Sequence, residues 1–155
     1  MNKIIISVDG PAGSGKQRIA KYISKKYKFF HLDSGILYRR LAAMIIKNKI
    51  NIDSSIKLRK FIDSLGVLSP RNHYSLRNEI ISKASSKIAI FPSVRTFINI
   101  QQRLIVKKML KLFKGCVIDG RDIGSKVFTE AQIKLFIDVK VQIRAKRRHK
   151  QLIEI

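Results

Sequence analysis

The sequence predicts an α/β fold built on a parallel β-sheet. Short apolar runs rich in β-branched residues alternate with longer stretches in which apolar side chains recur every three or four residues. The short runs are typical of buried parallel strands, and the longer stretches are typical of amphipathic helices. A glycine-rich segment joins the first run to the first amphipathic stretch, as in other strand-to-helix connections. With 155 residues the chain is long enough for one compact core, so we expect residues 1–155 to form a single domain.

Three apolar runs are expected to be buried strands, and a fourth is a further candidate. The three are Ile4–Val8, Cys116–Ile118 and Ile133–Ile137, and the candidate is Phe29–Leu32. Since strands and helices alternate, the connections should be right-handed crossovers, and the first and third runs should pair in parallel. The only cysteine, Cys116, lies in one of these runs and is expected to be a buried structural thiol.

The longer stretches are expected to form helices, because their apolar residues fall on one face. They are Lys16–Tyr27, Gly35–Lys47, Ser54–Leu65, Ser93–Phe113 and Arg144–Ile155. Pro92 suits the first turn of the fourth helix, where its missing N–H would have no helical partner in any case. Between the third and fourth helices, Gly66–Pro70 is expected to form a strand and a turn. This part of the chain interrupts the alternation, so residues 48–90 are expected to be a small insertion.

The chain is strongly basic, with 33 lysines and arginines against 10 acidic residues and a formal net charge of +23. Such a charge favours anionic partners, either nucleotides or nucleic acids. The lysines are scattered and isoleucine is abundant too, so an AT-rich genome is an alternative origin for the bias. Basic and aromatic residues do not interleave in the manner that stacks bases, which disfavours a nucleic-acid partner.

The sequence also bears on the compartment. No apolar run approaches the ~20 residues that a membrane span requires, and the N-terminus lacks the layout of a signal peptide. A single cysteine fits a reducing compartment. We therefore expect a cytoplasmic protein without membrane association, and a monomer.

The segment Gly10-Pro11-Ala12-Gly13-Ser14-Gly15-Lys16, called the glycine loop below, lies between the first expected strand and the first expected helix. This is the context of a phosphate-binding loop. Glycines let backbone N–H groups approach phosphate oxygens, and the helix N-terminus and Lys16 add positive charge. The usual pattern continues with a Ser or Thr that holds magnesium, whereas this chain has Gln17. The alternative is a glycine-rich turn that binds nothing.

A second polar cluster, which includes Asp33, Ser34 and Arg39, follows the fourth strand candidate. Ligands of α/β sheets bind at the carboxyl ends of strands, where this cluster should lie. Arg39 would fall about one and a half turns into the next helix, within reach of an anion. Asp33 and Ser34 could instead only cap that helix, and both interpretations stay open. His31 is better explained by packing or by a satisfied polar contact than by catalysis.

The third cluster, Asp119-Gly120-Arg121-Asp122-Ile123-Gly124, again follows an apolar run. Carboxylates, an arginine and glycines at a sheet edge suit an anion and a hydrogen-bonding ligand, although a polar turn with an Arg–Asp pair is the alternative. The charge run from Arg144 to Lys150 is either a solvated helix face or a contact to phosphate or nucleic acid. No histidine or cysteine cluster has the spacing of metal ligands, so a structural zinc site is not expected.

These clusters resemble those of the bacterial cytidylate kinases, a family of nucleoside monophosphate kinases, across nearly the whole chain. The distinctive blocks are Asp-Ser-Gly-x-x-Tyr-Arg at Asp33–Arg39 and Asp-Gly-Arg-Asp-x-Gly at Asp119–Gly124. The other matching segments are Ile6–Lys16, Ala84–Ser86, Phe91–Arg95, Val127–Phe128 and Ile133–Asp138. The resemblance implies a P-loop nucleoside monophosphate kinase core with a parallel sheet, in which residues 48–90 are a shortened CMP-binding insertion. It also implies transfer of the γ-phosphoryl group of ATP to CMP or dCMP with Mg²⁺.

The resemblance implies a role for each site residue. ATP would be held by the glycine loop, residues Gly10, Pro11, Ala12, Gly13, Ser14, Gly15 and Lys16, by Gln17 and Arg18 after it, and by Arg147 near the adenine. The monophosphate of CMP would be held by Arg39, Arg95 and Arg121, and its cytosine side by Ser34, Ser86 and Asp122. Lys16, Arg121 and Asp122 would be the catalytic residues. All of these should converge on one cleft that faces the glycine loop. Such chemistry needs positioning and charge neutralisation more than a protein nucleophile.

Three departures from the family pattern predict slow turnover. Gln17 and Arg18 stand where the family has Gly-Thr or Ser-Thr, the stretch between Val67 and Arg77 is short, and the sequence ends where a lid is expected to begin, either as a truncated C-terminus or as an incomplete record. A lid excludes water and adds positive charge around the transferring phosphoryl group. The alternatives to a kinase are a non-catalytic nucleotide-binding relic and, less favoured, a basic nucleic-acid-binding module.

Overall fold

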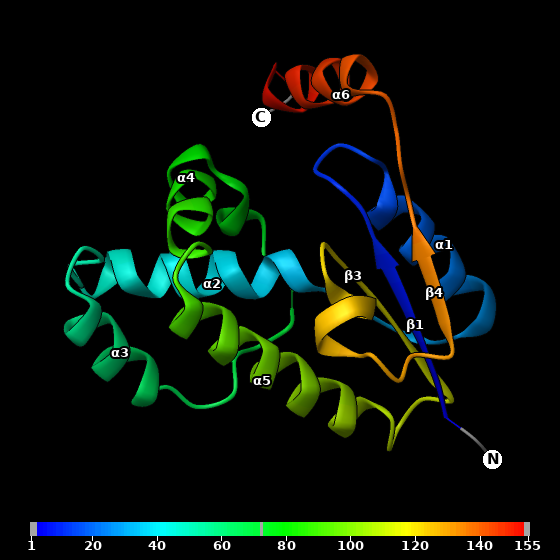
Figure 1. Ribbon diagram of the computed structural model, residues 1–155, viewed down its shortest axis with the longest axis horizontal. Helices are drawn as coiled ribbons and strands as arrows, with labels where there is room; N and C mark the ends of the chain where they lie inside the picture. The colour runs from blue at the N-terminus through cyan, green and yellow to red at the C-terminus, as the bar shows by residue number, and fades with distance from the viewer. Residues whose placement is uncertain (1–2, 72, 154–155) are drawn as a thin grey trace. The chain divides into compact units, whose positions relative to one another are not determined.

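The computed structural model of the protein describes residues 3–71 and 73–153 (Figure 1). The chain divides into two units, one formed by Met1–Asp33 and Val106–Ile155 and the other by Ser34–Ile105. The first unit contains the β-sheet and the second is helical. Of the helices in the described residues, none is long and apolar enough to cross a membrane.

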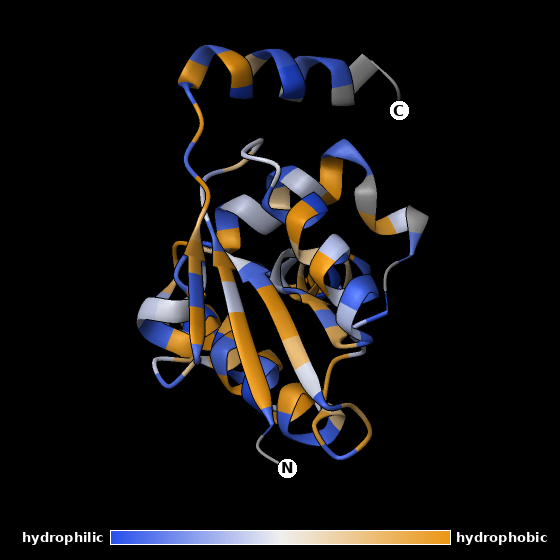
Figure 2. Ribbon diagram, turned by 90° about the vertical axis from the view of Figure 1, so that its right-hand side faces the viewer, coloured by the Kyte–Doolittle hydropathy of each residue, from blue (hydrophilic) through white to orange (hydrophobic). Residues whose placement is uncertain are grey.

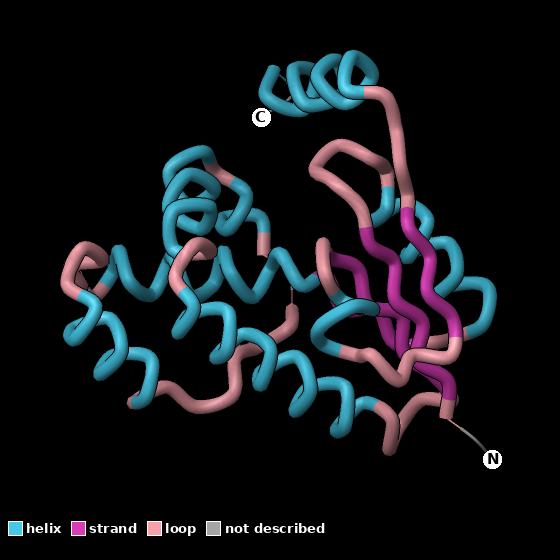
Figure 3. Tube along the Cα trace, in the orientation of Figure 1, coloured by secondary structure: helices cyan, strands magenta, loops and turns pink. Residues whose placement is uncertain are grey.

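A four-stranded parallel sheet is the centre of the first unit (Figure 3). Its strands are β1 (Ile4–Asp9), β2 (Phe30–Asp33), β3 (Gly115–Gly120) and β4 (Ile133–Phe136), in the spatial order β2-β3-β1-β4. β1 pairs in parallel with β3 and with β4, and β2 pairs in parallel with β3. The predicted α/β class, the four strands and the parallel pairing of the first and third runs are therefore confirmed.

Helix α1 (Lys16–Tyr27) covers one face of this sheet, and its predicted bounds are confirmed. Ala20 of α1 is fully buried against Ile6, Val8 and Val117 of the two central strands. Ile6 and Val8 are two positions apart on β1, so both side chains lie on the face of the sheet that α1 covers, because successive side chains of a strand point to opposite faces. The thiol of Cys116 is buried in β3, as predicted.

The first unit also holds η2 (Ile123–Val127), a short π-helical turn in contact with β1, and helix α6 (Val141–Ile153). The sequence predicts the last helix over Arg144–Ile155, but it begins three residues earlier, and residues 154–155 of that range lie outside the described residues. Figure 2 shows hydrophobic residues in its first turn and mainly hydrophilic ones after it. The first turn contains Val141 and Ile143, both exposed.

The second unit consists of helices joined by short connections. They are α2 (Ser34–Lys47), α3 (Ser55–Asp63), the 3-10 turn η1 (Tyr74–Arg77), α4 (Glu79–Ile88) and α5 (Pro92–Met109), whose last residues belong to the first unit. α2 packs against α4 and buries Leu37, Leu41 and Ile45. Local signals set these helices: the Ser54 hydroxyl caps the start of α3, and Pro92 opens α5 as predicted.

Two features of the second unit differ from the sequence prediction. The strand expected within Gly66–Pro70 is wrong, because residues 66–70 pair with no strand. The backbone N–H of Leu68 donates instead to Oε1 of Gln101 at 2.8 Å, so a side chain satisfies it. Helix α4 was not predicted, although Asn78 caps it by accepting from the N–H of Ile81 at 2.8 Å. The proposed insertion at residues 48–90 stays a prediction.

Candidate functional site

The glycine loop lies between β1 and α1 in the first unit (Figure 3). Gly13 and Gly15 have φ angles of 76° and 90°, in the left-handed region that favours glycine. A Cβ atom at Gly13 would lie 3.0 Å from the carbonyl oxygen of Arg144, so the backbone of α6 leaves little room for a side chain there. The conformation of the loop thus explains why the sequence places glycines at these positions.

Lys16 is the first residue of α1 and is half-buried beside the loop. Its Nζ donates to the carbonyl oxygen of Pro11 at 3.1 Å, which folds the side chain back along the loop. Burial lowers the pKa of the Lys16 ammonium below its usual value, and the nearby carboxylates, chiefly Asp119, oppose that shift. The lysine therefore lies among carboxylates at the loop, where an anionic ligand would meet its charge.

Gln17, which stands where a hydroxyl is usual, points to the end of β2. Its Nε2 donates to Oδ2 of Asp33 at 2.6 Å, and both side chains are half-buried. The neighbouring Arg18 is exposed. The residue after the loop lysine is thus a hydrogen-bond donor to a carboxylate.

Asp33 and Asp119 lie side by side at the carboxyl ends of β2 and β3, where they are register partners. Asp119 is buried, and its Oδ2 lies 3.1 Å from Nε2 of His31. Burial raises the pKa of the Asp119 carboxyl, and the hydrogen bond to His31 opposes the rise. His31 therefore has a satisfied polar contact, as predicted. The sequence placed Asp119 in the third polar cluster at the sheet edge but gave it no individual role.

Asp9, at the end of β1, is a residue that the sequence did not single out. Its two carboxylate oxygens accept from the backbone N–H groups of Ile123 and Gly124, each at 2.8 Å, and the side chain is buried. These bonds fix the start of η2, directly after Arg121 and Asp122. A buried carboxylate needs partners of this kind, since burying an unpaired charge is costly.

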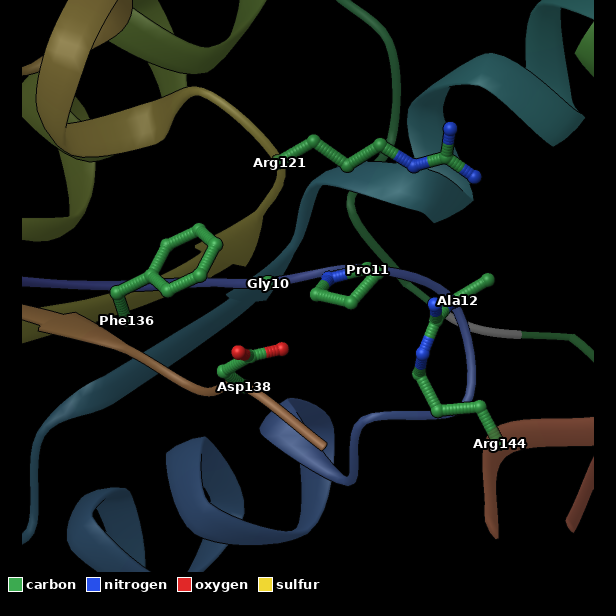
Figure 4. Close-up of a pocket in the computed structure, with 7 residues that line it drawn as sticks. All are labelled: Gly10, Pro11, Ala12, Arg121, Phe136, Asp138 and Arg144. Carbon is green, nitrogen blue, oxygen red and sulfur yellow. The ribbon is translucent and has the colours of Figure 1, made fainter. Parts of the chain in front are cut away.

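A pocket of about 610 Å³ opens beside the loop. It is lined by Gly10, Pro11, Ala12, Arg121, Phe136, Asp138 and Arg144. Figure 4 shows Arg121 on one side of the loop and Asp138 and Arg144 on the other. Arg121 is exposed, so its guanidinium remains accessible to a ligand. The guanidinium groups of Arg121 and Arg144 line the pocket together with small residues of the glycine loop. Guanidinium groups bind phosphate well, so this lining suits a phosphorylated ligand.

Arg147 reaches the loop from α6. Its Nη1 donates to the carbonyl oxygens of Gly13 and Ser14 at 3.3 and 3.1 Å. The first unit thus brings the glycine loop, Arg121 and Arg147 together. The assignment of Arg147 to the adenine end of ATP stays a prediction.

Four predicted site residues lie in the second unit. Ser34 is buried at the start of α2, and Arg39 is half-buried on the same helix. Ser86 is exposed on α4 and donates to the carbonyl oxygen of Ser82 at 3.1 Å, while Arg95 is half-buried on α5. The idea that these residues share a cleft with Arg121 and Asp122 stays a prediction.

The residues that the structure describes include no group of three or more His, Cys, Asp or Glu side chains arranged to hold a metal ion. The carboxylates of Asp33 and Asp119 are nevertheless adjacent beside Lys16. Mg²⁺ characteristically binds through one or two carboxylates together with water and substrate phosphates. The donor set beside the glycine loop therefore fits Mg²⁺ bound with a nucleotide.

Comparison with known proteins points to one family. A family model described as cytidylate kinase matches residues 6–155. A cytidylate kinase of Bartonella bacilliformis is 39% identical over 157 residues, which cover 99% of this chain and 69% of that protein. A cytidylate kinase of Pasteurella multocida is 37% identical, with 97% of this chain and 70% of that protein covered. A bifunctional pantoate ligase/cytidylate kinase of Prochlorococcus marinus is 37% identical over 93% of this chain and 30% of its own length.

The fold has a solved counterpart as well. The crystal structure of TT1252 from Thermus thermophilus matches with a TM-score of 0.54 at 17% identity, covering 99% of this chain and 78% of that chain. At this identity the likeness bears on the fold alone, and it agrees with the parallel sheet described above. The family assignment depends on the family model and on the relatives above 30% identity. The chain belongs to the cytidylate kinase family.

Proposed function

We propose that the protein transfers the γ-phosphoryl group of ATP to CMP or dCMP, giving ADP and CDP or dCDP. The observation that carries this proposal is the glycine loop, with left-handed glycines ahead of α1, Lys16 at the helix start and a pocket shared with Arg121. Phosphoryl transfer needs preorganised positive charge around phosphate oxygens, and this unit supplies it. The relatives at 37–39% identity are named as cytidylate kinases, which supports the choice of acceptor.

In this proposal each side chain acts on the charge of the phosphates. Lys16 leaves its contact with Pro11 and donates to the phosphates of ATP, and the loop backbone holds them in line with the acceptor. Arg121 binds the phosphate of CMP, where a guanidinium can donate two parallel hydrogen bonds. Asp122, directly before η2, would bind the cytosine side of CMP. In the second unit, Arg39 and Arg95 would bind the same phosphate, and Ser34 and Ser86 would face the base.

Mg²⁺ belongs to the proposal as the partner of ATP. Asp33 and Asp119 would hold it, because their carboxylates are adjacent at the strand ends and beside Lys16. When bound, the cation neutralises charge on the β- and γ-phosphates. His31 keeps the Asp119 carboxylate oriented through the 3.1 Å contact between Nε2 and Oδ2.

A coupled ADP-release assay with ATP, Mg²⁺ and either CMP or dCMP tests the reaction. Release that depends on CMP supports the proposal, and release without dependence on either acceptor contradicts it. The same assay tests whether turnover is slow in this chain, since Gln17 and Arg18 replace the usual hydroxyl positions. Turnover near the usual kinase range of ~1–100 s⁻¹ would contradict slow turnover.

The role of Arg121 has its own test. Calorimetry on Arg121→Ala should find a larger loss of affinity for CMP than for ATP, because the guanidinium is assigned to the acceptor phosphate. Arg59→Ala is the matched control, since Arg59 is 77% exposed and pairs only weakly with Asp63 at 3.8 Å. Equal losses for the two nucleotides would assign Arg121 elsewhere.

A non-catalytic nucleotide-binding protein is the second candidate. The observation in its favour is Gln17, whose amide is engaged with Asp33 where a hydroxyl would otherwise face magnesium. This candidate predicts that ATP and CMP bind by calorimetry while no ADP is released. Binding together with CMP-dependent release would rule it out.

A further inference from the structure

Gln17 departs from the phosphate-binding pattern and yet makes one of the shortest side-chain contacts beside the loop. Its Nε2 lies 2.6 Å from Oδ2 of Asp33. A carboxylate can only accept, so the amide nitrogen must be the group that faces it. Hydrogen bonds to a charged acceptor are shorter and stronger than neutral ones, which agrees with this distance.

The elements on either side make the contact rigid at both ends. Gln17 is the second residue of α1, which is fixed to the sheet by the buried Ala20. Asp33 is the last residue of β2, and its register partner is Asp119 on β3. Both Gln17 and Asp33 are half-buried, so water competes only in part for the hydrogen bond.

We infer that Gln17 is a positioning residue that holds the Asp33 carboxylate toward the Mg²⁺ of the bound nucleotide. This inference deepens the proposed function and depends on it. In the usual pattern a hydroxyl after the lysine meets the cation directly. In this chain the residue at that position would not contact the cation itself but would hold the carboxylate of Asp33, which does.

The physical reason is orientation. The Asp33 side chain ends in a carboxylate that can rotate about two bonds, and only some orientations turn an oxygen toward Asp119 and the loop. The Gln17 donor fixes one oxygen, Oδ2, and so restricts the direction of the other. Residues that orient a ligand of a metal typically change metal affinity by about 10- to 100-fold when they are replaced.

The test compares ATP affinity with Mg²⁺ and with EDTA by calorimetry. The ratio of the dissociation constant in EDTA to that in Mg²⁺ is called the magnesium gain. Gln17→Leu keeps the size of the side chain and removes the donor, and it should lower the magnesium gain by roughly 10- to 100-fold. Its loss of affinity for ATP should be smaller in EDTA than in Mg²⁺. Gln142→Leu, an exposed glutamine on α6, is the matched control.

A reciprocal variant separates positioning from simple attachment of α1 to β2. Gln17→Glu combined with Asp33→Asn restores a hydrogen bond between the two positions but moves the carboxylate to position 17. Positioning predicts that its melting temperature approaches wild type while the magnesium gain stays low. Recovery of the full magnesium gain would overturn the inference, because the place of the carboxylate would then not matter.

The remaining outcomes are also decisive. A wild-type magnesium gain in Gln17→Leu would overturn the inference and leave the proposed function intact. An equal loss of ATP affinity in EDTA and in Mg²⁺ would assign Gln17 to the loop itself and overturn it as well. No ATP binding by the wild-type chain would overturn the proposed function, and the inference with it.

Discussion

Replacing Asp9 with asparagine should destabilise the first unit more than a typical substitution does. Both oxygens of the buried carboxylate accept a backbone N–H at 2.8 Å, from Ile123 and from Gly124. Asparagine retains one acceptor and turns a donor toward the other N–H, so one bond is lost and one buried N–H is left unpaired. A hydrogen bond to a charged group contributes about 1.5–3 kcal/mol, and an unpaired buried donor costs about 1–3 kcal/mol. We expect the free energy of unfolding to fall by about 2–4 kcal/mol.

Urea unfolding followed by circular dichroism measures this loss. With a slope of about 1–3 kcal/mol per molar urea, a loss of that size lowers the midpoint by about 0.7–4 M. Asp63→Asn is the control, since Asp63 is 69% exposed and its pairing with Arg59 should contribute under about 1 kcal/mol. If the two variants unfold within about 0.5 kcal/mol of each other, the argument that Asp9 anchors η2 is wrong.

Three further predictions concern single residues. Gly13→Ala should lower the free energy of unfolding by about 1–2 kcal/mol, because alanine is strained at φ 76°. Gly66→Ala should leave the free energy of unfolding nearly unchanged, because a Cβ there meets no atom within 4 Å. Urea unfolding of the two variants compares them. Burial raises the pKa of the Cys116 thiol from 9.0 to about 12, so the thiol of the native protein should not react with a disulfide reagent at pH 8. The thiol of the unfolded chain ionises at lower pH than that of the native protein. The free energy of unfolding should therefore fall between pH 9 and 12, relative to that of Cys116→Ala. Gln101→Leu should cost about 1–3 kcal/mol in urea unfolding, because the buried N–H of Leu68 loses its acceptor; a loss below about 0.5 kcal/mol would show that another group replaces it.

Much of the first unit follows from local sequence patterns. The run Ile4–Val8, the glycine loop and the stretch Lys16–Tyr27 each carry their own signal, namely continuous β-branched residues, glycines ahead of a lysine, and a helical repeat. The structure confirms the strand, the left-handed glycines and both ends of the helix. Parallel pairing also follows, because strands separated by helices return in the same direction.

Other features depend on contacts that no local pattern reveals. Asp9 accepts a hydrogen bond from the backbone of Ile123, 114 residues away, and no sequence pattern around Asp9 predicts that partner. Val67 and Leu68 resemble a strand, but the acceptor for Leu68 is the side chain of Gln101, 33 residues further along. Helix α4 was missed because serines and a short apolar repeat weaken its pattern, while the capping residue Asn78 was the signal that remained.

The charge around the glycine loop differs from the overall charge of the chain, because acidic residues gather there. The net charge of +23 makes the chain an indiscriminate attractor of anions, and scattered lysines produce most of it. Half of the ten acidic residues nevertheless lie in the first unit at or near the glycine loop, namely Asp9, Asp33, Asp119, Asp122 and Asp138. Asp9 accepts from backbone N–H groups, Asp119 contacts His31, Asp33 accepts from Gln17, and Asp138 lines the pocket. On the proposed function, carboxylates beside Lys16 and Arg121 would restrict where a phosphate binds and would offer ligands to a cation, which bare positive charge cannot do. On the proposed function, the acidic side chains at the sheet edge would therefore work together with Lys16 and Arg121, and the scattered lysines would add only general attraction for anions.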